Sequence, residues 1–305
     1  MKPQLLVLIH LSEESKATIR SAFDIIYAPT REMRAAAIAG EARDVRVVLT
    51  NGSTGLTAAE MDTLGKLELA CALGAGFENI DSAHAAMRGI KIATGAGTND
   101  DCVADHAMGL VLAVVRNIPQ LDIACRGGIW REALALPPQL AGKRLGVAGL
   151  GIIGKKIARR AAAFDMEIGY FNRSRRDDVD YAYFGGVQQL AEWCDVLVMA
   201  TPGGPATRHL VGARELQALG PKGFLVNISR GSVVDTAALA AALSKGEIGG
   251  AGLDVYESEP KPPLELLEFK NVVLTPHMAG WSPEAITASV AKFLRNAADH
   301  FAAAG

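Results

Sequence analysis

Three glycines, spaced as G-x-G-x-x-G, lie between two runs of strand-forming residues and constrain the fold more than any other feature. Arg144–Ala148 predicts a short strand that ends directly before the first glycine, and Glu167–Phe171 predicts a second strand. Between them the pattern predicts a helix, whose apolar residues recur at helical spacing and would face the sheet: Ile153, Ile157 and Ala161. This strand–turn–helix–strand unit predicts a parallel α/β sheet.

The glycines suit a dinucleotide site. Gly149 permits a tight turn, Gly151 lets the backbone approach a pyrophosphate, and Gly154 allows close packing of helix on strand. The spacing alone is weak, because glycine makes up 32 of 305 residues, and a plain glycine-rich turn is the alternative. The flanking strand and helix favour cofactor binding by the turn and the start of the helix: Gly149, Leu150, Gly151, Ile152, Ile153 and Gly154.

The end of the second strand predicts the type of cofactor. NAD sites normally place Asp or Glu about 20 residues after the glycine turn, where it binds the ribose hydroxyls. Here Asn172, Arg173 and Ser174 follow the strand, then two more arginines, and the first carboxylate is Asp177. Arg173 can pair with a 2′-phosphate and Ser174 can donate a hydrogen bond to it. We therefore predict NADPH in preference to NADH, the alternative being a basic surface loop.

The rest of the chain predicts two domains. Residues 1–98 alternate strands and helices, which predicts a parallel sheet covered on both faces. The expected strands are Leu5–Ile9, Asp24–Tyr27, Val45–Leu49, Leu67–Leu73 and Lys91–Ala93, and the expected helices lie near 12–22, 30–40, 57–65 and 79–88. The second sheet adds strands at Val196–Ala200, Gly223–Ile228, Gly250–Leu253 and Val272–Thr275.

Two long helices are expected to join these domains. One begins at Asn99 and runs to about Arg126, with an apolar face of Val103, Ala107, Leu110, Val111 and Val114. The other begins after Pro283, runs to about Ala304 and is expected to return to the first domain. On the first helix, His106 is interpreted as structural, with a place in the cleft as the alternative; His209 is expected in a solvated loop.

Composition excludes several classes of protein. A chain of 305 residues is long enough for two cores. The 31 basic and 33 acidic residues give no footprint for nucleic acid or an anionic membrane. The four cysteines lack C-x-x-C spacing, which favours reduced thiols and a cytoplasmic location. No apolar run is long enough to span a bilayer, and no pattern predicts a metal site.

Polar side chains follow the strands of the second sheet, where α/β proteins bind their ligands. The cofactor-binding residues expected after these strands, at the same edge as the glycine turn, are Thr201, Pro202, Ile228, Ser229, Arg230, Asp254, His277 and Gly280. Glu259 is expected at this edge as well. His277 matches the protonation of a developing alkoxide, Glu259 would orient it, and Arg230 would hold a carboxylate beside a carbonyl. Each residue alone has a structural alternative, namely a surface charge, a loop acid or a packed histidine. Together they favour catalysis.

The chain resembles the D-isomer-specific 2-hydroxyacid dehydrogenase family over nearly its whole length. The shared motifs are Leu73–Asp81, Val103–Asp105, Gly149–Gly154, Asn227–Gly231, Gly252–Pro260 and Thr275–His277. The resemblance implies two doubly wound parallel-sheet domains, one Rossmann-type and one flavodoxin-like, with a cleft between them. Residues 1–98, completed by 283–305, would bind substrate, and residues 99–282 the dinucleotide.

The resemblance also implies roles. Arg230 would clamp the substrate, His277 would act as acid and base with Glu259 as its partner, and Asp254 would lie near the nicotinamide carboxamide. The Asn-Arg-Ser sequence is similar to that of hydroxyphenylpyruvate and glyoxylate/hydroxypyruvate reductases. Relatives of this kind are homodimers, and the long helix with Ile129 and Trp130 offers an apolar surface for that contact.

Two further segments concern the substrate. Ala75 and Gly76 follow a strand of the first domain, where successive N–H groups would form an anion nest, a plain turn being the alternative. Met278–Trp281 departs from many relatives, which have smaller residues there. We expect Trp281 to line the pocket, with core or interface packing as the alternative.

The leading prediction is NADPH-dependent reduction of a 2-oxoacid (hydroxypyruvate, glyoxylate or an arylpyruvate) to the D-2-hydroxyacid. One alternative is an NADH-preferring dehydrogenase of another 2-hydroxyacid. Another is a nucleotide-sensing interaction protein on the same fold. Arg230, Glu259 and His277 together favour an enzyme, since a sensor does not need them.

Overall fold

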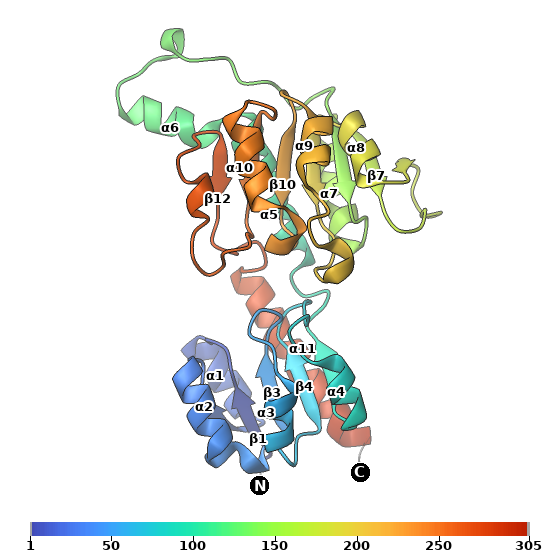
Figure 1. Ribbon diagram of the computed structural model, residues 1–305. Helices are drawn as coiled ribbons and strands as arrows, with labels where there is room; N and C mark the ends of the chain where they lie inside the picture. Colours follow the sequence, from blue (N-terminus) through green and yellow to red (C-terminus); the bar gives the residue numbers. More distant parts are fainter. Residues whose placement is uncertain (1, 304–305) are drawn as a thin grey trace. The chain divides into compact units, whose positions relative to one another are not determined.

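The structure, a computed structural model, describes residues 2–303. These residues fold into two compact units (Figure 1). The first unit contains the residues up to Asn99 together with those from Gly280 onward. The second unit is Asp100–Ala279. The sequence predicts these divisions after residues 98 and 282. Each unit is a parallel sheet with helices.

The sheet of the first unit has the strand order β2-β1-β3-β4-β5, which is the flavodoxin-like order. Its strands are β1 (Gln4–Val7), β2 (Asp24–Tyr27), β3 (Val47–Thr50), β4 (Leu69–Ala72) and β5 (Lys91–Thr94). Its helices are α1 (Glu13–Arg20), α2 (Arg31–Ala39), α3 (Ala58–Thr63), α4 (Ser82–Met87) and α11 (Pro283–Ala303). The short helices α1 to α4 each begin at a side-chain cap: Ser12, Thr30, Thr57 and Asp81.

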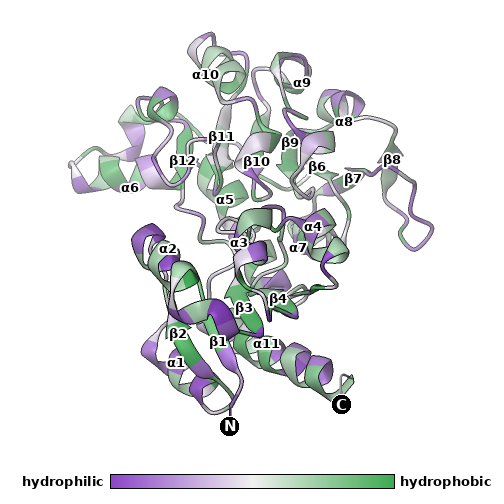
Figure 2. Ribbon diagram, turned by 60° about the horizontal axis from the view of Figure 1, so that its bottom comes forward, coloured by the Kyte–Doolittle hydropathy of each residue, from purple (hydrophilic) through white to green (hydrophobic). Residues whose placement is uncertain are grey.

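The central strands of this unit, β3 and β4, are almost entirely apolar because they are buried along their whole length. Both faces of β1 and β3 are buried, as expected for a parallel sheet. One face packs on α1 and α11, where Val290 and Phe293 join a cluster with Leu5 and Val7. The strands are hydrophobic and the outward helix faces polar (Figure 2).

The sheet of the second unit has the order β12-β11-β10-β9-β6-β7-β8, and every pairing is parallel. Its strands are β6 (Arg144–Ala148), β7 (Glu167–Phe171), β8 (Ala182–Phe184), β9 (Val196–Met199), β10 (Phe224–Asn227), β11 (Gly250–Leu253) and β12 (Val272–Leu274). The chain starts at the central strand β6, runs to one edge, and returns to β9 on its other side. This is the Rossmann order, and its switch point lies between β6 and β9.

Helices cover both faces of this sheet (Figure 1). α5 (Asp100–Val115) and α7 (Ile152–Ala162) pack on one face, and α8 (Val187–Trp193), α9 (Ala213–Leu219) and α10 (Thr236–Ser244) on the other. Short 3₁₀ turns complete the chain at Glu41–Asp44, Arg131–Ala133, Pro205–Thr207, Gly231–Val233 and Leu264–Leu266. The predicted inward positions of α5 and α7 are buried or packed on the core.

Two sequence expectations are wrong. The helix expected from Asn99 to about Arg126 is two helices, α5 and α6 (Ile118–Arg126), bent by 58°. Asn117 adopts a left-handed conformation (φ 54°) between them, and Pro119 lies in the first turn of α6, where a missing N–H is tolerated. The second error is β8, an edge strand beside β7 that the pattern did not predict.

The chain from α6 to about Leu136 extends away from the sheet of its unit (Figures 1 and 2). α6 has no buried residue, and several large apolar side chains of this arm are exposed: Ile118, Ile123, Ile129, Trp130 and Leu136. Within residues 2–303 no single helix is long and apolar enough to cross a membrane, and only the bent pair of α5 and α6 meets the criteria of length and hydropathy together.

Candidate active site

The glycine turn has the geometry that the sequence predicts. Gly149 has φ 100°, a conformation that favours glycine, and its N–H donates to Phe171 O at 2.9 Å. A Cβ on Gly154 would lie 2.2 Å from Gly149 O, so only glycine lets α7 approach the turn so closely. These contacts fix the N-terminus of α7 at the carboxyl end of β6.

The start of α7 is open. Gly151 is the N-cap and gives no side-chain cap, and a Cβ there would meet nothing within 4 Å. Asn172, at the end of β7, accepts a hydrogen bond from Leu150 N at 2.7 Å through Oδ1. The turn is thus tied to the neighbouring strand, and the first N–H groups of the helix are available to an anion.

A polar group lies beside this turn. Thr201 Oγ1 is buried and has no hydrogen-bond partner among the residues that the structure describes. A Cβ on Gly149 would lie 2.8 Å from Thr201 N, which places Thr201, after β9, next to the glycine turn. Because buried hydroxyl groups are normally paired, this oxygen indicates a ligand at the switch point.

The basic segment after β7 is only partly paired. Arg176 Nε donates to Asp178 Oδ1 at 2.9 Å, and Lys155 of α7 pairs with the same carboxylate. These two partners hold the pKa of Asp178 far below its usual value. Arg173, Ser174 and Arg175 are exposed, and neither Arg173 nor Arg175 forms an ion pair within residues 2–303.

The loop after β10 is fixed by Asn227, which is fully buried. Asn227 Oδ1 accepts from the hydroxyl of Ser229 at 2.7 Å and its Nδ2 donates to Arg230 O at 3.0 Å. Ile228 and Ser229 are buried, whereas Arg230 is partly exposed and its Nη1 donates to Ser229 O at 2.6 Å. The sequence contains Asn227 in a motif, but its orienting role is visible only in the structure.

Asp254 organises the segment after β12. It is 1 % exposed, and it accepts hydrogen bonds from Thr275 Oγ1 at 2.6 Å and from the backbone N–H groups of Met278 and Ala279 at 2.8 and 2.9 Å. Burial disfavours its charge, but these bonds and the nearby His106 outweigh burial and hold the pKa of Asp254 below its usual value. Asp254 therefore holds the turn that carries His277.

His277 and Glu259 form the pair that the sequence predicts. Nδ1 of His277 lies 2.8 Å from Oε2 of Glu259, and the other carboxylate oxygen accepts from Tyr256 N at 2.9 Å. His277 has φ 56°, held by hydrogen bonds from its N–H to Asp254 O and Thr275 O. Since Nδ1 faces the carboxylate, Nε2 is the ring nitrogen that this pair leaves for another partner.

The remaining predicted residues belong to the first unit. Ala75 and Gly76 lie in the loop after β4, and Ala75 is exposed. Gly280 and Trp281 precede α11, and Trp281 is 55 % exposed. Trp281 therefore does not belong to the core of its unit. This excludes core packing and leaves pocket lining and interface packing.

His106, which the sequence predicts to be structural, is a neighbour of the site. His106 of α5 places Nε2 2.9 Å from Thr275 Oγ1 and 3.3 Å from Asp254 Oδ1. It supports the turn of His277 rather than standing alone as a packed histidine. Its position on the helical face next to Ala107 does not reveal this, because the partner lies 169 residues away in the sequence.

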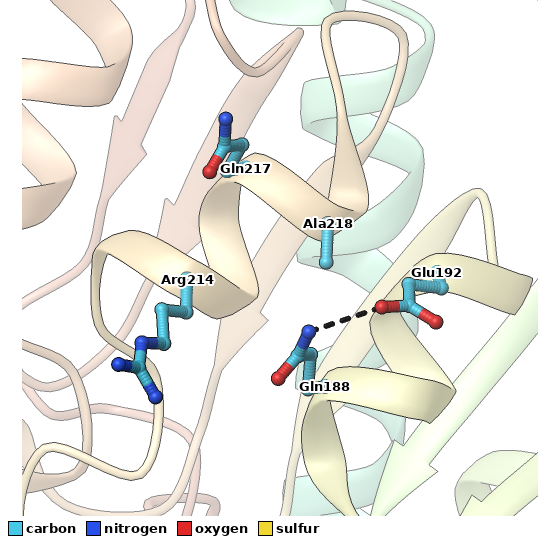
Figure 3. A pocket seen from close by; sticks show the side chains of 5 residues that line it. All are labelled: Gln188, Glu192, Arg214, Gln217 and Ala218. Atoms are coloured by element: carbon cyan, nitrogen blue, oxygen red, sulfur yellow. Dashed lines mark hydrogen bonds between the residues drawn. The ribbon is translucent and has the colours of Figure 1, made fainter.

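A pocket on the second unit lies elsewhere. It is lined by side chains of α8 and α9: Gln188, Glu192, Arg214, Gln217 and Ala218 (Figure 3). Gln188 donates to Glu192 at 3.1 Å within it. No predicted site residue lines it, so it adds nothing to the chemistry of the sheet edge.

A Rossmann-type sheet with an open glycine turn, an arginine and a Glu–His pair at one edge defines a nicotinamide-dependent oxidoreductase. The chain belongs to the D-isomer specific 2-hydroxyacid dehydrogenase family, whose NAD binding domain model matches residues 108–279. It is an NAD(P)-dependent enzyme of this family acting on the CH–OH group of donors.

Individual relatives cover most of the chain. It is 41% identical to hydroxyphenylpyruvate reductase of Plectranthus scutellarioides over 81% of this chain and 79% of the relative. It is 35% identical to glyoxylate/hydroxypyruvate reductase A of Arabidopsis thaliana over 97% and 95%. The crystal structure of NADPH-dependent glyoxylate/hydroxypyruvate reductase from Sinorhizobium meliloti, in complex with NADP and malonate, superposes with a TM-score of 0.89 at 37% identity, covering 95% and 91%.

Proposed function

We propose that this enzyme uses NADPH to reduce a 2-oxoacid to the D-2-hydroxyacid, with His277 as general acid. The Nδ1–Oε2 contact of 2.8 Å between His277 and Glu259 is the observation on which the proposal rests. It gives an imidazole oriented by a carboxylate at the edge of a dinucleotide-binding sheet. The similarity to reductases of glyoxylate, hydroxypyruvate and hydroxyphenylpyruvate supports the substrate class.

The residues of the turn fit a dinucleotide. The open N-terminus of α7 and the absence of a Cβ at Gly151 suit a pyrophosphate. Thr201 Oγ1, buried beside the turn, offers an unused donor and acceptor to the cofactor. In this proposal Pro202, Ile228 and Ser229 continue the site along the sheet edge, and Asp254 and Gly280 lie toward the nicotinamide.

When bound, the reduced nicotinamide supplies a hydride to the carbonyl carbon of the substrate. The developing alkoxide oxygen then takes a proton from Nε2 of His277, while the Nδ1–H bond to Glu259 is kept. The negative carboxylate of Glu259 stabilises the protonated imidazole before transfer and fixes the plane of the ring. In the reverse direction the same nitrogen accepts the hydroxyl proton.

Arg230 is assigned to the substrate. A guanidinium presents two parallel N–H donors, which match the two oxygens of a 2-oxoacid better than a single ammonium does. Its backbone is fixed by Asn227, so the side chain starts from a defined point. Ala75 and Gly76 would bind the substrate carboxylate through backbone N–H groups, and Trp281 would favour apolar substituents.

The preference for NADPH rests on the segment after β7. Asp178 pairs with both Arg176 and Lys155, whereas the exposed Arg173 and Arg175 keep their charge available. Asn172 ties this strand end to the glycine turn, so Arg173 and Ser174 follow directly where the ribose of the adenosine is expected.

We further propose a cytoplasmic homodimer. The exposed apolar side chains of the arm, Ile129 and Trp130 among them, form a surface suited to a second copy. The four cysteines are free thiols, which suits a reducing compartment.

The experiment is the oxidation of NADPH, followed at 340 nm, with glyoxylate, hydroxypyruvate and phenylpyruvate. Chiral chromatography then resolves the products of hydroxypyruvate and phenylpyruvate, since the product of glyoxylate is achiral. The proposal predicts turnover with at least one of them, and the D-enantiomer wherever the product is chiral. NADPH binding without turnover of any oxoacid would instead favour the nucleotide sensor.

A further inference from the structure

Glu257 joins three loops at the carboxyl edge of the second sheet. Its Oε1 lies 2.8 Å from Nε2 of His209, in the loop after β9. Its Oε2 accepts from the N–H and the hydroxyl of Thr236, at the start of α10, at 3.1 and 2.8 Å. Because Glu257 itself follows β11, one carboxylate connects the segments that follow three neighbouring strands.

His209, which the sequence predicts to be solvated, is held on both sides. Its side chain is 34 % exposed, and Nδ1 lies 3.7 Å from Asp235 Oδ2, opposite the contact with Glu257. Its backbone is left-handed (φ 48°), and its N–H donates to Ser232 O at 2.8 Å. Burial opposes the charge of Glu257, but hydrogen bonds from His209 and Thr236 outweigh it and lower the pKa of that carboxyl.

The cluster adjoins both parts of the candidate active site. A Cβ on Gly231, next to Arg230, would lie 2.1 Å from the carbonyl carbon of Tyr256 and 2.6 Å from Glu257 N, so the two loops touch backbone to backbone. Tyr256 N in turn donates to Glu259 Oε1 at 2.9 Å. A shift of Glu257 would therefore move the turn that orients the partner of His277.

We propose that His209 is a positioning residue for the reduction: by holding Glu257 it fixes the Tyr256–Glu259 turn and thereby the carboxylate that faces His277. This inference rests on the proposed function, because that function assigns Glu259 to the orientation of His277. His209 touches neither of the two catalytic side chains in this arrangement and acts through the turn.

A double-mutant cycle tests the inference with NADPH and the best 2-oxoacid. His209→Ala is expected to lower kcat roughly three- to thirtyfold, the range of coupling between residues of one network, and to leave the KM for NADPH unchanged. In the Glu259→Gln background the same change is expected to have little further effect. Losses that multiply independently would overturn the inference, because His209 would then act by another route.

Two variants sharpen the cycle. His209→Gln keeps a donor within reach of Glu257 and is expected to recover most of kcat; a loss equal to that of His209→Ala would contradict the role of this contact. His84→Ala is the matched control, because Nε2 of His84 on α4 lies 2.8 Å from Oδ1 of Asp62 on α3, in a similar pair. It is expected to leave kcat unchanged, and an equal loss there would make the effect of His209 nonspecific.

Hydrogen exchange on the purified full chain gives a readout without turnover. Deuterium uptake in a peptide spanning residues 254–262 is expected to rise in His209→Ala and in Glu257→Gln, but not in His84→Ala. If the unsubstituted enzyme reduces no 2-oxoacid, the proposed function is refuted. Deuterium uptake would still show whether His209 and Glu257 hold the Tyr256–Glu259 turn. Unchanged uptake in both variants of the cluster would overturn the positioning role.

Discussion

At the scale of single residues, the proposed chemistry depends on which nitrogen of His277 is available to a substrate. Glu259 occupies Nδ1, and the backbone of His277 is held by Asp254 and Thr275. Contacts within the protein therefore orient the imidazole, and the proposed acid–base role would benefit from that fixed orientation. His106 and Asn227 extend this order to the two loops that carry His277 and Arg230.

Arg230, Asp254 and His277 could be chosen as candidates from the sequence because each follows a strand within a few residues, and parallel strands end at one edge. Their orientations do not follow. Asp254 is predicted near the cofactor, and the structure shows its carboxylate occupied by Thr275 and two backbone N–H groups. Contacts of this kind join positions far apart in the chain, and no local pattern encodes them.

Arg230 offers a direct test of substrate recognition. Arg230→Ala is expected to abolish productive binding of 2-oxoacids, and Arg230→Lys to restore it poorly, because a single ammonium cannot reproduce a two-pronged contact. The measurement is kcat/KM for the best oxoacid in both variants, with NADPH binding as the control for folding. Full recovery with lysine would show that charge alone matters.

Arg173 tests the choice of cofactor. A hydrogen bond to a charged group contributes about 1.5–3 kcal/mol, so Arg173→Ala should weaken NADPH binding by roughly ten- to a hundredfold. NADH binding should change far less, and Arg176→Ala, whose guanidinium is already paired with Asp178, should have a smaller effect on NADPH. The dissociation constants of both cofactors decide this. Equal losses for NADPH and NADH would remove Arg173 from the phosphate site.

At the scale of elements, the glycine turn and α7 must pack closely on each other and must also leave space for a cofactor. Different glycines serve these two requirements. A Cβ on Gly154 would clash with Gly149 O, whereas a Cβ on Gly151 would meet no protein atom within 4 Å. The fold therefore requires glycine at position 154, whereas at position 151 only the proposed pyrophosphate requires it.

Gly154→Ala should therefore lower the melting temperature, by roughly 2–12 °C for an overpacking cost of about 1–3 kcal/mol, and should weaken NADPH binding. Gly151→Ala should fold normally, because its φ of −81° suits alanine, yet bind NADPH at least about tenfold more weakly. Calorimetry and fluorescence titration measure the two effects. Unaltered NADPH affinity in Gly151→Ala would place the pyrophosphate elsewhere.

Most elements could be predicted because their apolar periodicity is strong. The strands β2, β6, β7 and β11 coincide with their predicted bounds. The apolar pattern did not predict the break between α5 and α6, because apolar residues occur on both sides of the break. Asn117 and Pro119 change the direction of the backbone there. β8 escaped because it is three residues long and lies at an edge, where little burial marks its sequence.

At the scale of the whole molecule, the arm after α5 carries the assembly prediction. Trp130 is 66 % exposed and Leu136 is 94 % exposed, which is costly for side chains of this size unless a partner covers them. Light scattering at micromolar concentration should give about twice the chain mass of 32.0 kDa. Trp130→Glu should shift the mass toward one chain, and the control Met87→Glu, on exposed α4, should not. A monomeric parent would refute the dimer.

The central claim is that His277 is the general acid for carbonyl reduction, and turnover of His277→Ala tests it most directly. With NADPH and the best 2-oxoacid, kcat should fall by roughly 10²–10⁴, the usual contribution of a positioned acid, while NADPH affinity barely changes. Turnover near that of the parent, in a variant that still binds NADPH, would contradict this account of the site.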